Sequence, residues 1–319
     1  MKIITNVWNF TTQQGSVITI GTFDGVHLGH QKIIEKIIDS GQKNDLIPTI
    51  FTFFPHPKMI LQPNTAPKQI QTIEEKAIML QNLGIQQLVI QSFDKNFADL
   101  SPEDFVKMIL VEKLQVKKII IGYDHRFGKD RTANITDLQH FGKKYNFEVE
   151  EIPAQEINEV AVSSTKIRKA LEEGKIPEAN AYLGYFFSFS GEVIHGKKLG
   201  KKLTFPTANI KLSANYKLIP KDGVYAIFTI MNGKKIFGMM NIGNNPTIDG
   251  KQSSIEVHFF DFESDLYGKN LTIYLYKYIR EEQKFVSIEA LKHQLEKDEI
   301  TIRNVFSSDK KNLKKISNP

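Results

Sequence analysis

The strongest constraint on this chain is the segment GTFDGVHLGH at residues 21–30. An apolar, β-branched run at 16–20 precedes it and is typical of a strand, whereas 31–38 carries apolar pairs at helical spacing. The segment is therefore a predicted strand-to-helix turn. His27 and His30 would share one face of the first helical turn, where unpaired backbone N–H groups and the helix dipole favour phosphate. Two imidazoles there can donate hydrogen bonds to a phosphate under attack.

The first half of the chain alternates strands with helices, which is typical of a parallel, doubly wound sheet. We expect strands at about 46–54, 87–90, 116–121 and 147–152, and helices at about 73–83, 101–112 and 135–145. In such sheets ligands bind at the carboxyl ends of the strands, near the switch in strand order. The loops 21–30, 54–57 and 122–131 all follow strands, so we expect a ligand site at that edge.

A further helix is expected to begin within VSSTKIR at 162–168. Ser164 and Thr165 are common at helix N-termini, so an ordinary capped helix would explain the segment. Their hydroxyl groups, the N–H groups of the helix and the Arg168 guanidinium would also suit a phosphate. The residues by themselves favour the ordinary capped helix.

From residue 185 onward, runs of β-branched and aromatic residues replace the strand–helix alternation. We expect strands at 187–194, 223–231, 235–242, 254–260 and 271–278, after a short helix at 177–183 and before a last helix at 288–299. Turn signals such as Asn232-Gly233 separate the strands. The pattern predicts a small antiparallel barrel or sandwich, and we divide the chain into domains 1–184 and 185–319.

Two features of the second domain have polar side chains in a pattern that suits phosphate chemistry. In the stretch GKKLGKKLTFPTAN at 196–209, a mobile surface loop is the ordinary explanation, and a flap over phosphates is the functional one. Thr207 and Asn209 would share one face of an extended segment and offer two neutral oxygens to magnesium. Glu256 lies on the polar face of an expected strand, where a solvent-facing carboxylate is the usual explanation.

In order and spacing, these segments resemble the bacterial bifunctional riboflavin kinase/FAD synthetase family. GTFDGVHLGH resembles the HxGH signature of its FMN adenylyltransferase half, and VSSTKIR resembles its ISSTxIR element. The segment 122–128 resembles GxDFRFG, with His125 in place of the usual aromatic residue. The stretch 196–209 resembles the riboflavin kinase signature GxxxGxxLGFPTAN, with Thr204 where glycine is usual. The resemblance covers about 17–303.

The resemblance implies a Rossmann-like nucleotidyltransferase domain at 1–184 and a riboflavin kinase β-barrel at 185–319. It implies phosphorylation of riboflavin to FMN by ATP with magnesium, then adenylylation of FMN by ATP to FAD and pyrophosphate. The residue roles that follow are catalytic His27, His30 and Glu256, ATP contacts Gly21, Phe23, Asp24, Ser164, Thr165, Arg168, Gly196 and Gly200, flavin contacts Asp124 and Arg280, and magnesium ligands Thr207 and Asn209. In the family, the matching glutamate accepts the proton of the riboflavin 5′-hydroxyl.

Composition limits the alternatives. The chain has 319 residues and no cysteine, which excludes disulfides, thiolate zinc sites and thiol catalysis. Its net charge of +6 is compatible with RNA or with ligands rich in phosphate. An RNA-binding protein is one alternative, but the chain has no KMSKS sequence and no evident series of stacking aromatics in the barrel strands. A nucleotidyltransferase for another acceptor is a second, and it leaves 185–319 unexplained.

The N-terminal residues have no signal-peptide pattern, and no run of the chain is long and apolar enough to span a membrane. We therefore expect a cytoplasmic protein with no membrane partner. We also expect no nucleic-acid partner, and the sequence does not predict the oligomeric state.

Overall fold

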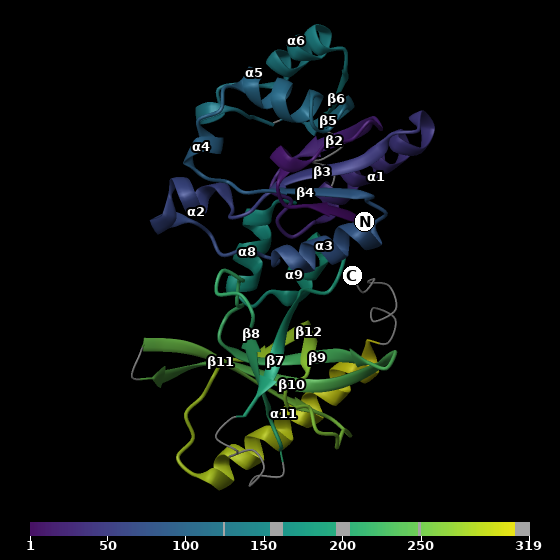
Figure 1. Ribbon diagram of the computed structural model, residues 1–319. Helices are drawn as coiled ribbons and strands as arrows, with labels where there is room; N and C mark the ends of the chain where they lie inside the picture. The colour runs from purple at the N-terminus through teal and green to yellow at the C-terminus, as the bar shows by residue number, and fades with distance from the viewer. Residues whose placement is uncertain (124, 154–161, 196–204, 248–249, 310–319) are drawn as a thin grey trace. The chain divides into compact units, whose positions relative to one another are not determined.

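The computed structural model in Figure 1 describes residues 1–123, 125–153, 162–195, 205–247 and 250–309. The chain divides into two compact units, Met1–Ser164 and Thr165–Pro319. The first is an α/β unit and the second is built around a β-barrel.

The first unit is organised around a parallel sheet with the strand order β1-β4-β3-β2-β5-β6. Its strands are β1 (Lys2–Ile4), β2 (Ser16–Ile20), β3 (Ile47–Phe53), β4 (Gln87–Gln91), β5 (Val116–Gly122) and β6 (Glu148–Ile152). The predicted parallel sheet is confirmed, and the short edge strand β1 is an addition to it. Its three residues are too few to give a periodic signal in the sequence.

The helices of the first unit cover both faces of the sheet. They are α1 (Leu28–Asn44), α2 (Pro57–Leu61), α3 (Ile73–Asn82), α4 (Lys95–Ala98), α5 (Pro102–Asp104) and α6 (Ile135–Tyr145), with the short segments η1 (Val7–Asn9), η2 (Pro63–Thr65), η3 (Phe105–Val111) and η4 (Lys129–Arg131). The predicted helix 101–112 is α5 continued by η3, which is a π-helix. Because crossovers between parallel strands are right-handed, α1 and α3 lie on the face opposite α6.

The strand order places the switch point beside β2. Strands β2, β3 and β4 follow one another toward one edge, whereas β5 and β6 lie on the other side of β2. The loops after β2, β3 and β5 therefore leave neighbouring parallel strands at the same edge of the sheet. This confirms that the loops 21–30, 54–57 and 122–131 leave the same edge of the sheet, where ligands bind in doubly wound folds.

The second unit is a closed antiparallel barrel with the order β10-β11-β8-β7-β12-β9. After α8 (Ser164–Glu172) and α9 (Ile176–Leu183), its elements are β7 (Ser188–Ile194), β8 (Ala208–Leu212), β9 (Gly223–Met231), β10 (Lys234–Thr247), β11 (Gly250–Phe259), β12 (Asn270–Arg280) and the C-terminal helix α11 (Ile288–Ser308). The structure thus has the barrel and not the sandwich. The predicted turn between β9 and β10 has left-handed backbone at Asn232 and Gly233.

Two elements of the second unit are longer than predicted. Strands β10 and β11 remain paired as far as Thr247 and Gly250, through a stretch rich in Asn, Gly and Pro that reads as a loop. Helix α11 continues to Ser308 because Ile302 and Phe306, four residues apart, are buried against the barrel. In both places tertiary pairing extends an element beyond its local sequence signal.

We predict that Asn180 is essential to the stability of the second unit. Its side chain is buried in α9, where Nδ2 donates to the Leu275 carbonyl at 2.9 Å and Oδ1 accepts from the Phe187 N–H at 2.7 Å. Asn180→Leu leaves both backbone groups unpaired in the interior, so the free energy of unfolding should fall by about 2–4 kcal/mol. Urea denaturation followed by far-UV circular dichroism measures this.

The control for that prediction is Asn304→Ala, at an exposed position of α11, which should change stability by less than about 0.5 kcal/mol. An Asn180→Leu protein as stable as this control would show that water replaces the lost amide.

Candidate active sites

The turn after β2 has a strained backbone. Phe23, Gly25 and Val26 have φ values of 46°, 84° and 35°, in the left-handed region. Glycine adopts this conformation freely, but a bulky and a β-branched side chain do not, and each costs about 1–3 kcal/mol. Such strain is stable only where surrounding contacts fix the backbone, and it concentrates at functional sites.

The Asp24 carboxylate supplies one of these contacts. The side chain is 1% exposed, and its oxygens accept the N–H groups of Ile70 at 3.0 and 3.1 Å and of Gln71 at 3.3 Å. The Asp24 carbonyl accepts the Ser164 hydroxyl at 2.9 Å. Asp24, predicted as an ATP contact, therefore directs its carboxylate toward the segment before α3.

The Thr22 carbonyl is the second anchored group of the turn. It accepts the Lys76 ammonium at 2.6 Å and the Thr52 hydroxyl at 3.2 Å. Lys76 lies in α3 and is 5% exposed. Burial lowers the pKa of Lys76 to about 8, although the nearby Asp24 carboxylate opposes this shift.

The two histidines lie together at the start of α1. His27 is the N-cap, and its Nδ1 accepts the His30 N–H at 3.4 Å, which places the proton of a neutral His27 ring on Nε2. The rings stack with centroids 3.7 Å apart, and Phe23 lies 4.9 Å from the His30 ring. Both predicted catalytic histidines are thus on one helical turn, beside the strained backbone.

The environment of His30 keeps its ring neutral. Burial, followed by the nearby His27 and Lys76, holds the pKa of His30 well below its ordinary value of 6.5. Among the described residues, no group hydrogen-bonds the buried Nδ1 of this ring. An unsatisfied buried nitrogen of this kind is expected where a ligand supplies the missing partner.

The structure describes some of the other residues predicted for this site. Gly21 directly follows β2 and donates its N–H to the Phe51 carbonyl at 3.0 Å. Thr165 and Arg168 lie in the first two turns of α8, which begins at Ser164, within the predicted segment 162–168. Asp124 lies outside the described residues.

The second site is a row of polar side chains across three strands of the barrel. Glu256 of β11 is paired directly with Asn209 of β8 on one side and with Asn241 of β10 on the other. Directly paired residues project from the same face of a sheet, so the three side chains are neighbours. The flanking Ile255 and Val257 are buried on the opposite face, as the alternation predicts.

Thr207 lies two residues before Asn209, in the extended segment that leads into β8. The Nδ1 of His258 is 2.9 Å from the carbonyl of Pro206, so the segment still runs beside β11 at this point. The hydroxyl of Thr207 and the amide of Asn209 provide hard, neutral oxygen donors, which fit magnesium better than a transition metal. Gly196 and Gly200 lie outside the described residues.

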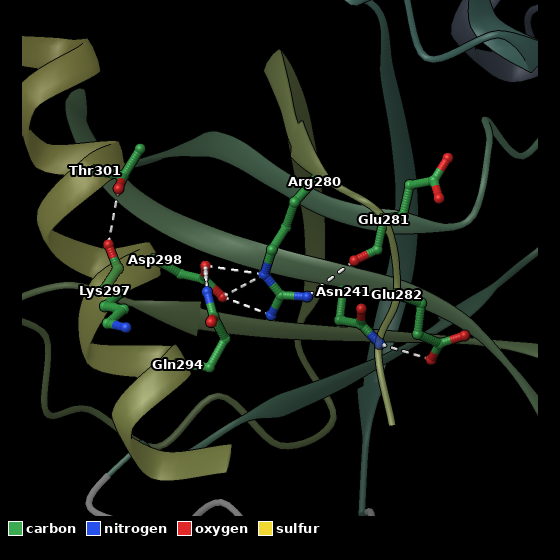
Figure 2. A network of polar contacts seen from close by, with 8 residues as sticks. All are labelled: Asn241, Arg280, Glu281, Glu282, Gln294, Lys297, Asp298 and Thr301. Carbon is green, nitrogen blue, oxygen red and sulfur yellow. Dashed lines mark hydrogen bonds and ion pairs between the residues drawn. The ribbon is translucent and has the colours of Figure 1, made fainter. Parts of the chain in front are cut away.

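Figure 2 shows the polar network at the end of β12. The Arg280 guanidinium binds the Asp298 carboxylate of α11 through Nε at 2.9 Å and Nη2 at 2.6 Å, and Gln294 donates to the same carboxylate at 2.8 Å. The Asp298 side chain is almost fully buried, so this pair is shielded from solvent. Beside it, Asn241 donates to Glu282 at 3.5 Å. Helix α11 thus orients Arg280, the predicted flavin contact.

Sequence reasoning assigned no role to Lys76 or Asn241. Asn241 belongs to a polar stretch of β10, and only the register shows that it lies beside Glu256. Lys76 belongs to the run Glu-Glu-Lys, which is typical of a solvated helix face. Neither residue has a local signal, because each is placed by an element distant in sequence.

In the described part of the chain, no helix is long and apolar enough to cross a membrane, and no three His, Asp or Glu side chains form a metal-binding group. The fold and the two polar sites define a two-part nucleotide-using transferase: a doubly wound domain with an HxGH turn, and a barrel with amide and carboxylate groups in one row.

Comparison with known proteins gives the family. The FAD synthetase family model matches residues 9–166, and the riboflavin kinase family model matches 183–306. The chain belongs to the bifunctional riboflavin kinase/FMN adenylyltransferase family. Both predicted activities and the use of ATP are thereby confirmed, in preference to an RNA-binding protein or a transferase for another acceptor.

Relatives of that description match over almost their whole length. The protein from Buchnera aphidicola subsp. Acyrthosiphon pisum is 42% identical over 97% of this chain and 100% of its own. The Escherichia coli K12 protein is 36% identical over 97% and 99%. A crystal structure from Streptococcus pneumoniae, described as a macrolide-efflux protein, has 32% identity, covers 95% of this chain and 98% of its own, and gives a TM-score of 0.85.

The neutral state of His30 predicts how stability depends on pH. Because the pKa of His30 is lowered in the folded protein, the unfolded protein binds more protons below about pH 6.5. The stability that His30 contributes is therefore complete above that pH and is lost as the pH falls toward the folded-state pKa. Unfolding of the first unit, followed by the fluorescence of Trp8, should show a smaller loss of stability between about pH 7 and pH 5 in His30→Gln than in wild type.

The matched control is His140→Gln, at an exposed position of α6 in the same unit. This variant should keep the wild-type dependence on pH. If His30→Gln also keeps it, folding does not lower the pKa of His30.

Proposed function

We propose that residues 185–319 phosphorylate riboflavin to FMN and that residues 1–184 adenylylate FMN to FAD. The observation that carries this assignment is that each family match covers one polar site. The FAD synthetase match contains the turn at 21–30, and the riboflavin kinase match contains the row from Asn209 to Asn241. Both reactions consume ATP, so we place the protein in the cytoplasm.

In the adenylyl transfer, an oxygen of the FMN phosphate attacks the α-phosphorus of ATP, and the bond from that phosphorus to the bridging oxygen of pyrophosphate breaks. No protein nucleophile is needed, since catalysis is positioning and charge stabilisation. His27 and His30 donate hydrogen bonds to the α-phosphate in this proposal. Gly21, Phe23 and Asp24 contact ATP. The pyrophosphate side is bound by Ser164, Thr165 and Arg168. The flavin is contacted by Asp124.

A neutral His30 ring suits this role, because a neutral imidazole donates one hydrogen bond from a defined nitrogen. In His27, Nδ1 accepts the His30 N–H, so Nε2 is the nitrogen that can donate to the phosphate. The rings are held by stacking and by the N-cap, so little reorganisation is required when charge develops on the phosphate.

In the kinase reaction, the 5′-hydroxyl of riboflavin attacks the γ-phosphorus of ATP, and ADP leaves. Glu256 orients the hydroxyl and accepts its proton, which is transferred late in phosphoryl transfer, so position matters more than basicity. Thr207 and Asn209 would hold magnesium, which neutralises charge on the nucleotide phosphates when bound. Gly196 and Gly200 would cover the phosphates, and Arg280 would contact the flavin.

We predict that His27→Ala and His30→Ala proteins stop at FMN. Each loses a donor to the α-phosphate, which should raise the barrier by about 3 kcal/mol and slow FAD formation by roughly 10²-fold. The measurement is a time course with riboflavin, ATP and magnesium, in which chromatography resolves riboflavin, FMN and FAD. FMN formation in the same samples is the internal control. FAD formation at the wild-type rate in both variants would remove the histidines from the mechanism.

We predict the opposite result for Glu256→Gln. The amide keeps the shape of the side chain but cannot accept the proton, so FMN formation should slow by roughly 10²–10⁴-fold. FAD formation from added FMN should continue at the wild-type rate. Glu263→Gln, at an exposed position after β11, is the matched control and should form FMN normally. Normal FMN formation by Glu256→Gln would assign the proton to another group.

A further inference from the structure

The strained turn needs support from outside its own sequence. Within the turn, the Val26 N–H donates to the Phe23 carbonyl at 3.2 Å, and this contact spans only the strained residues themselves. The Thr22 carbonyl and the Asp24 carboxylate instead reach β3 and the 70–76 segment, far away in sequence. The position of His27, which directly follows Val26, therefore depends on residues that no signature motif contains.

Lys76 makes the shortest of these contacts, with Nζ 2.6 Å from the Thr22 carbonyl. A capping box fixes its position: the Thr72 hydroxyl accepts the Glu75 N–H at 3.2 Å, and the Glu75 carboxylate accepts the Thr72 N–H at 2.9 Å. Lys76 is the next residue, and it is buried like Ala77 and Leu80 of the same helix.

An ammonium group loses its hydration when it is buried, so its burial is unfavourable unless new interactions compensate for that loss. Asp24 is the opposite charge that faces it, and His27 and His30 are the titratable rings nearby. A cation at this position does two things at once. It donates a hydrogen bond to the Thr22 carbonyl, and its charge disfavours a second positive charge on His30.

We propose that Lys76 is a positioning residue for adenylyl transfer: its ammonium holds the Thr22 carbonyl and thereby fixes the left-handed turn that aims His27 and His30 at the α-phosphate. This inference rests on the proposed role of the two histidines. Lys76 touches no reacting atom in this account. It acts through the backbone of the turn and through its charge beside the imidazoles.

The test compares Lys76→Met with Lys76→Arg in the full-length chain. Methionine keeps the length and apolar stem without the ammonium, so kcat for FAD formation from added FMN should fall roughly 10- to 100-fold, with a smaller change in KM for ATP. Arginine keeps the cation and a donor, so it should restore part of kcat. Ring NMR signals of His30 should show a raised pKa in Lys76→Met and not in Lys76→Arg.

Two controls separate this role from general damage. FMN formation by the same Lys76→Met chain should be unchanged, and Lys143→Met, at an exposed position of α6, should leave both activities unchanged. If Lys76→Met does not fold, Thr52→Val removes the other donor to the Thr22 carbonyl with little change in shape. It should lower kcat for FAD formation by a few fold.

Unchanged kcat together with unmoved His30 signals in Lys76→Met, or unchanged kcat in Thr52→Val if that variant is needed, would overturn the proposal. Failure of the proposed function would give a different result: His27→Ala and His30→Ala would then form FAD at the normal rate. A loss of kcat in Lys76→Met with no shift of the His30 pKa, and with no recovery in Lys76→Arg, would also overturn it, because the lysine would then be structural only.

Discussion

A buried carboxylate holds the region on which the first site depends. Asp24 accepts three hydrogen bonds from the backbone N–H groups of Ile70 and Gln71, which lie just before α3. The carboxylate and the N–H groups compensate one another for the loss of hydration on burial. This contact joins the turn after β2 to the segment before α3, and Lys76 of α3 makes a second contact to the same turn.

In the barrel, strand register brings the polar side chains of the second site together. Its catalytic candidates come from three strands, and direct pairing brings Asn209, Glu256 and Asn241 into one row without any loop. A site on paired strands is held more rigidly than one on loops, because every ladder hydrogen bond fixes it. At the end of β12, the Arg280–Asp298 pair adds α11 to this arrangement.

Much of the architecture was predictable, because sheet type and ligand-binding edge follow from periodicity and connection rules. His27 and His30 were predictable because their turn carries its own signature. Lys76 was not, since its role depends on a carbonyl in a distant segment. The extension of β10 and β11 was missed for the same reason: pairing overrides turn-rich sequence. The direction of the Asp24 carboxylate was not predictable either, because a buried and an exposed aspartate in a turn have the same sequence pattern.

The pairing of Asn209 with Glu256 has a consequence for how this chain can change in length. Side chains alternate between faces with a period of two, so a one-residue shift within β11 would turn Glu256 to the interior and bring Val257 to the polar row, and a one-residue shift within β8 would turn Asn209 away from that row. A one-residue change in length is therefore compatible with this site in the connections between strands, and not within β8 or β11.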